Sequence, residues 1–225
     1  LHWGKNQKGM QAYETNSEPV NIGKFMGFDH DFFADNEKAW LLLRDKAVEM
    51  ALAFDAAGYH KQIINRLLEP WSHITVLVTA TEWSNFFELR DHADAEPHLR
   101  LLAQRMKAAM EASTPVQLRP GDWHLPFVNG GQMPRDLDTA TKEANLVLAV
   151  ACAASVSYKT VDGLPITTEA ATRIYSKLAT QPLHASPFEH QAVVAKVPHN
   201  LGRNFRGGWA QHRALVEMGA LGEFL

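Results

Sequence analysis

Helical spacing of apolar residues recurs in three long stretches of this chain, whereas β-branched runs are short. From Asp35 or Asn36, either of which can cap a helix, apolar side chains follow at three- and four-residue steps until Gly58, a residue suited to end a helix. A second amphipathic helix, with proline at its first position, is predicted over 97–112. A third begins at Asp138 or Thr139, either of which can cap it. The pattern predicts an α+β fold of mixed helix and sheet, rich in helix.

Strand signals are fewer. The run ITVLVTAT over 74–81 is rich in β-branched residues and predicts a strand, and HQAVVAKV over 190–197 alternates weakly. Residues 1–35 lack a sustained period and are expected to form an irregular arm. Proline and glycine punctuate 113–137, which predicts a long connecting loop. The organisation expected is a single domain over 1–225.

Composition excludes several classes of protein. A chain of 225 residues can bury a core without disulfide bonds or other cross-links, and its one cysteine permits no internal disulfide. Lys and Arg total 22 against 25 Asp and Glu, so the net charge of −3 provides no field for nucleic acid or an anionic membrane. The sequence contains neither a signal peptide nor an apolar run of the roughly 20 residues that a membrane span needs. We therefore expect a cytoplasmic protein.

Common catalytic motifs are missing. The sequence contains no phosphate-binding P-loop, no G-x-G-x-x-G turn and no G-x-S-x-G elbow. His184, Glu189 and His190 in HASPFEH come nearest to a metal site, but their spacing fits neither metalloprotease pattern, so no metal is expected. Cys152 lies in an apolar helical stretch, where a thiol usually serves as a small hydrophobe.

The stretch over 60–90 carries more polar groups than a purely structural segment needs. Arg66 and Arg90 bracket the predicted strand, and a guanidinium fork can bind phosphate or the carbonyl edge of a pyrimidine. Asn85 can donate and accept at once, which suits a heteroaromatic ring. The alternative is that both arginines form local ion pairs with carboxylates such as those of Glu69, Glu82 and Glu88.

Four segments resemble the flavin-dependent thymidylate synthases, the ThyX family. NRLLEPWSHITVLVTATEWSNFFELR is similar to the C-terminal signature of that family, in which an arginine before a proline leads to an Asn-Phe-Leu-x-Leu-Arg helix. CAASVSY over 152–158 resembles its Ala-Ala-Arg-Val-Ser-Tyr segment, and HASPFEH over 184–190 its His-x-Ser/Thr-Pro-Phe-Glu-His motif. GWAQHR over 208–213 resembles the approach to its Arg-His-Arg sequence.

The order of these blocks is reversed relative to ordinary family members, as in a circular permutation. The opening LHWGKNQKGMQA resembles phage-type members, in which a His-Arg-x-x-Ser-x-Asn-x-x-Ser signature comes earlier in the chain. That signature is expected upstream of Leu1, so an N-terminal segment is expected to be missing. Two further positions depart from the family: Ser155 replaces an arginine, and Thr79 replaces a flavin-contacting asparagine.

The resemblance implies a role for each matching residue. Arg66 would hold the nucleotide phosphate, and Arg90 would polarise the uracil edge so that C5 becomes nucleophilic. The implied FAD contacts are Ser157, Ser186, Glu189, Asn85, His212 and Arg213.

The implied reaction transfers a one-carbon unit from methylenetetrahydrofolate to C5 of dUMP, with NADPH as reductant, and gives dTMP. A homotetramer is implied as well. Two alternatives stay open: a related pyrimidine-nucleotide hydroxymethylase, and a non-catalytic relative that binds flavin or nucleotide.

Overall fold

The computed structural model describes residues 1–9, 14–158, 166–196 and 200–225. Where the sequence predicted a single domain, the chain divides into two compact units. Unit 1 comprises 1–74 and 86–111, and unit 2 comprises 75–85 and 112–225.

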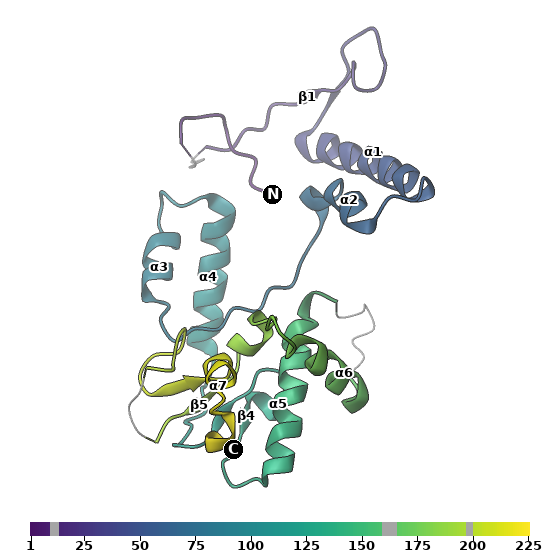
Figure 1. The fold of residues 1–225 in the computed structure, drawn as a ribbon. Helices are drawn as coiled ribbons and strands as arrows, with labels where there is room; N and C mark the ends of the chain where they lie inside the picture. The colour runs from purple at the N-terminus through teal and green to yellow at the C-terminus, as the bar shows by residue number, and fades with distance from the viewer. Residues whose placement is uncertain (10–13, 159–165, 197–199) are drawn as a thin grey trace. The chain divides into compact units, whose positions relative to one another are not determined.

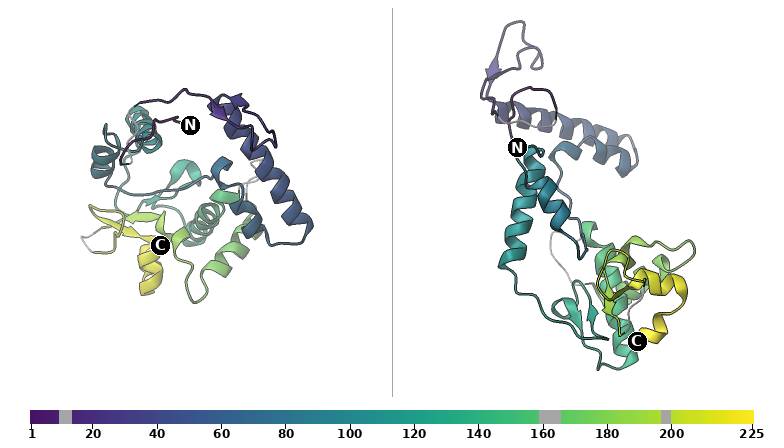
Figure 2. Two further views of the ribbon diagram at one scale, coloured as in Figure 1. Left: turned by 90° about the horizontal axis from the view of Figure 1, so that it is seen from above. Right: turned by 90° about the vertical axis from the view of Figure 1, so that its left-hand side faces the viewer.

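Unit 1 is built around α1 (Asn36–Ala56), which runs as one continuous helix in every view (Figures 1 and 2). Asp35 caps it, because an oxygen of its carboxylate accepts from the backbone N–H of Lys38 at 2.7 Å. The helix ends just before Gly58, whose φ of 79° favours glycine. Both ends therefore confirm the sequence prediction.

Three more helices belong wholly or mostly to unit 1. They are α2 (Lys61–Arg66), α3 (Ser84–Arg90) and α4 (Pro97–Ala112), and a 3₁₀ turn, Glu69–Trp71, follows α2. The bounds of α4 are those that its amphipathic pattern and leading proline predicted.

The N-terminal arm is irregular, as predicted, apart from one small ribbon. Here β1 (Val20–Asn21) pairs antiparallel with β2 (Phe33–Ala34). Residues 10–13 of the arm lie outside the described residues.

Unit 2 holds an antiparallel sheet in the order β4-β3-β5-β6. Its strands are β3 (Trp123–His124), β4 (Gln132–Met133), β5 (Ala192–Val194) and β6 (Trp209–Gln211). The predicted loop over 113–137 is therefore wrong in part, since it contains β3 and β4. Trp123 pairs with both Met133 and Val193, so the strand exists because of a partner that lies far away in the sequence.

Helices and turns complete unit 2. The helix α5 (Thr139–Ala154) packs against α6 (Thr168–Leu178), and α7 (His212–Met218) follows β6 (Figure 1). Four 3₁₀ turns are described, at Asn129–Gly131, Val156–Tyr158, Ser186–Glu189 and Leu221–Phe224. The buried core comprises Trp123, Leu125, Val128, Met133, Leu146, Ala149, Val193, Ala210 and Leu215.

Mixed helix and sheet, with helix predominant, confirm the expected α+β class. In the part of the chain that the structure describes, no helix combines the length and apolar character needed to cross a bilayer.

Candidate functional site

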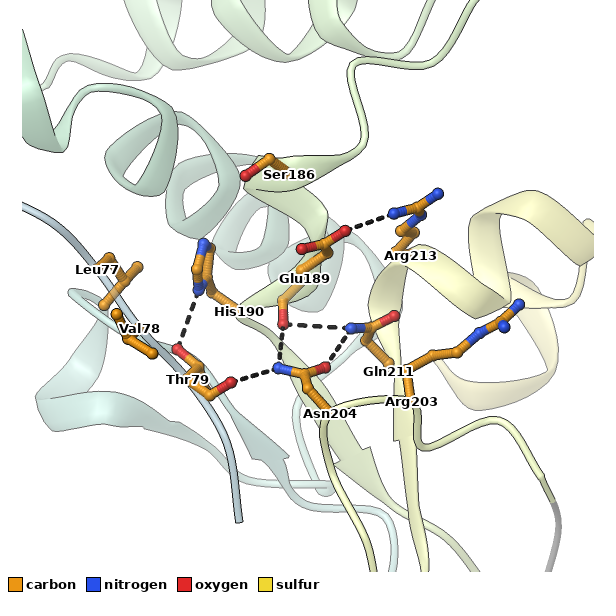
Figure 3. A pocket seen from close by; sticks show the side chains of 10 residues that line it. All are labelled: Leu77, Val78, Thr79, Ser186, Glu189, His190, Arg203, Asn204, Gln211 and Arg213. Atoms are coloured by element: carbon orange, nitrogen blue, oxygen red, sulfur yellow. Dashed lines mark hydrogen bonds and ion pairs between the residues drawn. The ribbon is translucent and has the colours of Figure 1, made fainter. Parts of the chain in front are cut away.

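A cavity of about 500 Å³ lies in unit 2, where three segments far apart in the sequence meet (Figure 3). It is lined by Leu77, Val78, Thr79, Ser186, Glu189, His190, Arg203, Asn204, Gln211 and Arg213. The lining includes the guanidinium groups of Arg203 and Arg213 and the carboxylate of Glu189; Arg213 pairs with Glu189 and Glu217, and Arg203 lies 3.8 Å from Glu217. Such a cavity combines hydrogen-bond donors and acceptors with a short apolar wall.

The segment 75–81 forms one wall as extended chain outside any described sheet. The sequence predicted a strand over Ile74–Thr81, and that prediction is wrong. The side chains of Ile74, Val76 and Val78 are 74%, 68% and 60% exposed, and no described strand lies beside them to form a ladder. Composition rich in β-branched residues favours extended backbone, but only a neighbouring strand makes it a sheet.

Asn204 holds this segment in place through its side chain. Its amide nitrogen donates to the carbonyl oxygen of Thr79 at 2.5 Å and to that of Glu189 at 3.1 Å. Its backbone oxygen accepts from the N–H of Thr81 at 3.2 Å. The amide of Gln211 donates in turn to Asn204 and to the carbonyl oxygen of Glu189 (Figure 3). This network fixes the wall without a β ladder.

His190 makes a second contact with this segment. Nδ1 of His190 lies 3.0 Å from the hydroxyl of Thr79. Burial lowers the pKa of His190, and the charge of Glu189 opposes that effect. Burial also lowers the pKa of His124, with a further contribution from His190. The two imidazoles are therefore neutral at neutral pH. That of His190 can share a hydrogen bond with the hydroxyl of Thr79.

Glu189 and Arg213 face each other across the cavity mouth. The guanidinium of Arg213 donates to Glu189 through Nη1 and to Glu217 through Nε, the latter at 2.7 Å. Both hydrogen bonds raise the pKa of Arg213, and the one to Glu217 has the larger effect. Because both members of the Glu189 pair are more than a third exposed, the pair orients the side chains more than it stabilises the fold.

A short turn presents Ser186 and Glu189 to the cavity. Between them Phe188 is fully buried, with its ring 5.4 Å from that of Tyr175 and 5.3 Å from that of His212. Because Phe188 is fixed in the core, the turn holds the side chains of Ser186 and Glu189 toward the cavity.

His212 does not line the cavity. It is fully buried between the rings of Trp123 and Phe188, and its Nε2 has no partner among the described residues. Its Nδ1 lies 3.4 Å from Oε1 of Gln191. Burial lowers the pKa of His212 to about 3. The implied flavin contact is therefore placed in the protein core.

This burial predicts a pH-dependent stability. The folded-state pKa of about 3 lies below the ordinary value, so the unfolded chain takes up the proton first as pH falls. From pH 7 to pH 5 the free energy of unfolding should fall by about 2 kcal/mol through this residue alone, and the loss continues toward pH 3. Urea unfolding of the wild type and of His212→Phe at pH 7 and pH 5 measures this loss of stability. Equal losses in the two proteins would contradict the prediction.

The other implied FAD contacts lie near or outside the cavity. The hydroxyl of Ser157 donates to the carbonyl oxygen of Thr75 at 3.4 Å, so it touches the segment that forms the wall. Asn85 is exposed at the second residue of α3 and does not line the cavity. Of the six predicted contacts, the structure brings Ser186, Glu189 and Arg213 to one cavity.

The two predicted substrate arginines belong to unit 1. Arg66 ends α2 and lies 3.9 Å from Glu69, with both side chains about 70% exposed (72% and 67%), which matches the local ion pair left open as the alternative. Arg90 is exposed at the last residue of α3 and forms no ion pair with the other described residues. Neither arginine lines the cavity of unit 2.

Sequence reasoning missed Arg203 and Asn204 as lining residues. They lie in the glycine-rich stretch between HASPFEH and GWAQHR. The sequence signal that could have found them was a run of polar residues next to glycines. In the structure the loop is folded tightly at Gly202, where an added Cβ would lie 2.0 Å from the carbonyl oxygen of Phe205.

No group of three or more metal-ligating side chains occurs within the described ranges. None of the protein-family models, curated proteins or solved structures compared with the chain matches it.

Proposed function

We propose that the chain is an FAD-binding enzyme of the ThyX type, which transfers a one-carbon unit from methylenetetrahydrofolate to C5 of dUMP with NADPH as reductant. The observation that carries the proposal is the convergence of Ser186, Glu189 and Arg213 on one cavity. These residues come from two blocks that resemble the same family, and each was expected to touch the same cofactor.

The chemistry of the cavity fits a flavin nucleotide. Leu77 and Val78 provide an apolar surface for a ring, and a phosphate group could replace Glu217 as the partner of the guanidinium groups of Arg203 and Arg213. Oε1 of Gln211 is buried without a partner among the described residues, which leaves an acceptor for a ring N–H. When bound, the flavin supplies the hydride chemistry, which the protein side chains cannot perform.

The protein's own part is to bind and to polarise. Glu189 can accept from ribityl hydroxyls, and Ser186 can donate or accept. Arg66 would hold the nucleotide phosphate, and Arg90 would donate to the uracil carbonyl edge, where negative charge develops.

The proposal includes a homotetramer in the cytoplasm. Apolar side chains on α1 support association, since Leu43, Met50 and Leu52 are 43%, 53% and 63% exposed and only Ala51 of that helix is buried. Exposed apolar surface of this kind marks contact sites.

Titration with FAD tests the cofactor directly. The protein should quench flavin fluorescence with a dissociation constant at or below tens of micromolar. Arg213→Gln should weaken binding about tenfold or more, since a hydrogen bond to a charged group contributes roughly 1.5–3 kcal/mol.

Arg206→Gln is the matched control, because it removes the same charge from a neighbouring residue that does not line the cavity. Its affinity for FAD should equal that of the wild type. A wild-type protein that binds no FAD in this range would refute the proposal.

A further inference from the structure

Glu217 lies on α7 and contacts two guanidinium groups that line the cavity of unit 2. Its Oε1 accepts from Nε of Arg213 at 2.7 Å, and its Oε2 lies 3.8 Å from Nη2 of Arg203. Both arginines lie on the side of the cavity away from Thr79 (Figure 3), and Glu217 itself does not line the cavity. Each oxygen of one carboxylate therefore faces a different arginine.

The two arginines depend on this carboxylate to different degrees. Arg213 has a second anionic partner, since its Nη1 donates to Glu189. Arg203 forms no other ion pair with the described residues, and its distance of 3.8 Å from Glu217 is too long for a hydrogen bond. The guanidinium of Arg203 therefore keeps its donors available to another anion that reaches the same place.

The backbone of Arg203 is unusual as well. Its φ of 59° lies in the left-handed region, which favours glycine and costs stability in any residue that carries a bulky side chain. The residue before it, Gly202, is required by the close approach of the chain to Phe205. An arginine in such a conformation, at the wall of a cavity, indicates that its side chain has a function.

We propose that Glu217 is a displaceable counter-ion, which holds the guanidinium groups of Arg203 and Arg213 together when no ligand is bound and gives way to a diphosphate group. Phosphate oxygens accept paired hydrogen bonds from guanidinium groups, and a diphosphate presents oxygens to both arginines, as the carboxylate does. The exchange replaces one anion by another beside the same two cations, so neither arginine is left without a partner.

The exposure of the three side chains permits this exchange. Those of Glu217, Arg213 and Arg203 are 34%, 37% and 61% exposed, and ion pairs open to solvent are weak. The inference rests on the proposed function for the source of the diphosphate, which is FAD. It goes further in assigning a role to Glu217, which lies outside the cavity and competes with the ligand.

The test titrates the full chain with inorganic pyrophosphate in a calorimeter. Glu217→Gln should bind pyrophosphate about fivefold more tightly than the wild type, because a neutral amide is displaced more readily than a carboxylate. If Glu217 served only to position the arginines, the same change would weaken binding. The double variant with Arg203→Gly should lose the gain, and glycine suits the backbone at a φ of 59°.

Glu223→Gln is the matched control. It removes the same charge from an exposed residue of unit 2 that does not line the cavity and forms no ion pair with the other described residues. This variant should bind pyrophosphate like the wild type. The proposal is overturned if Glu217→Gln binds no more tightly than the wild type, or if Glu223→Gln gains as much.

A measurement on the wild type decides the matter even where a variant fails to fold. In a ¹H–¹⁵N spectrum the Nε–H resonance of Arg213 should shift on addition of pyrophosphate and saturate, because its acceptor changes, and a resonance that does not move overturns the proposal. The proposed function fails separately. If the pyrophosphate results hold but FAD does not bind, the counter-ion role is supported and the flavin is refuted. If FAD binds but Glu217→Gln gains nothing, only the counter-ion role is refuted.

Discussion

Replacement of Arg90 by lysine is expected to lower kcat on the order of 100-fold or more at saturating nucleotide. Under the proposed function, the guanidinium of Arg90 donates to the uracil edge at the point where negative charge develops. Lysine keeps a positive charge but lacks the planar pair of donors, so the substitution separates geometry from charge. The side chain is exposed and has no ion-pair partner in the described structure, so the change should leave the fold intact.

The measurement is single-turnover oxidation of reduced flavin in the presence of dUMP and methylenetetrahydrofolate. Arg66→Ala is the companion variant. A phosphate contact contributes mainly to binding, so this change should raise KM for the nucleotide and affect kcat less. If Arg90→Lys reacts at the wild-type rate, Arg90 is not the activating group and the proposed mechanism is wrong at that step.

Phe188→Ala is expected to destabilise unit 2 by about 3–5 kcal/mol, because it removes a fully buried ring and leaves a cavity. For a chain of this size the loss lowers Tm on the order of 10 °C. Since Phe188 anchors the turn that carries Ser186 and Glu189, affinity for FAD should fall with it.

Calorimetry on Phe188→Ala and on Phe25→Ala measures the stability effect. Phe25 lies in the arm and is 50% exposed, so the same substitution there should change Tm little. A variant Phe188→Ala with the Tm and FAD affinity of the wild type would show that the turn does not depend on this ring.

Local signals predicted the helices well. The bounds of α4 follow from a leading proline and an amphipathic period. The start of α1 was predicted from two candidate caps, Asp35 or Asn36, and Asp35 is the one that caps it. Each of these signals lies within a few residues of the structure that it predicts. The sheet of unit 2 escaped prediction for the opposite reason, since Trp123 lies in a strand through its pairing with Met133 and with the distant Val193. A two-residue strand has no period of its own to detect.

The candidate site was also predictable only where its residues lie in a recognisable local motif. Ser186, Glu189 and Arg213 lie in motifs whose residue types indicated a ligand, and they meet in one cavity. The partners that hold the wall, above all Asn204, act through side-chain hydrogen bonds to the backbone of a distant segment. His212 shows the converse error, because a histidine within a polar motif gives no local sign that two aromatic rings will enclose it.

The wall at 75–81 has a consequence for the order in which the chain folds. The amide that holds Thr79 belongs to Asn204, 125 residues later, and the imidazole that contacts it comes 111 residues later. Contacts of such separation raise the contact order and slow folding. During synthesis the β-branched run therefore leaves the ribosome long before its partners exist. An exposed stretch of this composition is prone to pair with other chains. We expect the nascent protein to need chaperone binding until residues 204–213 have emerged.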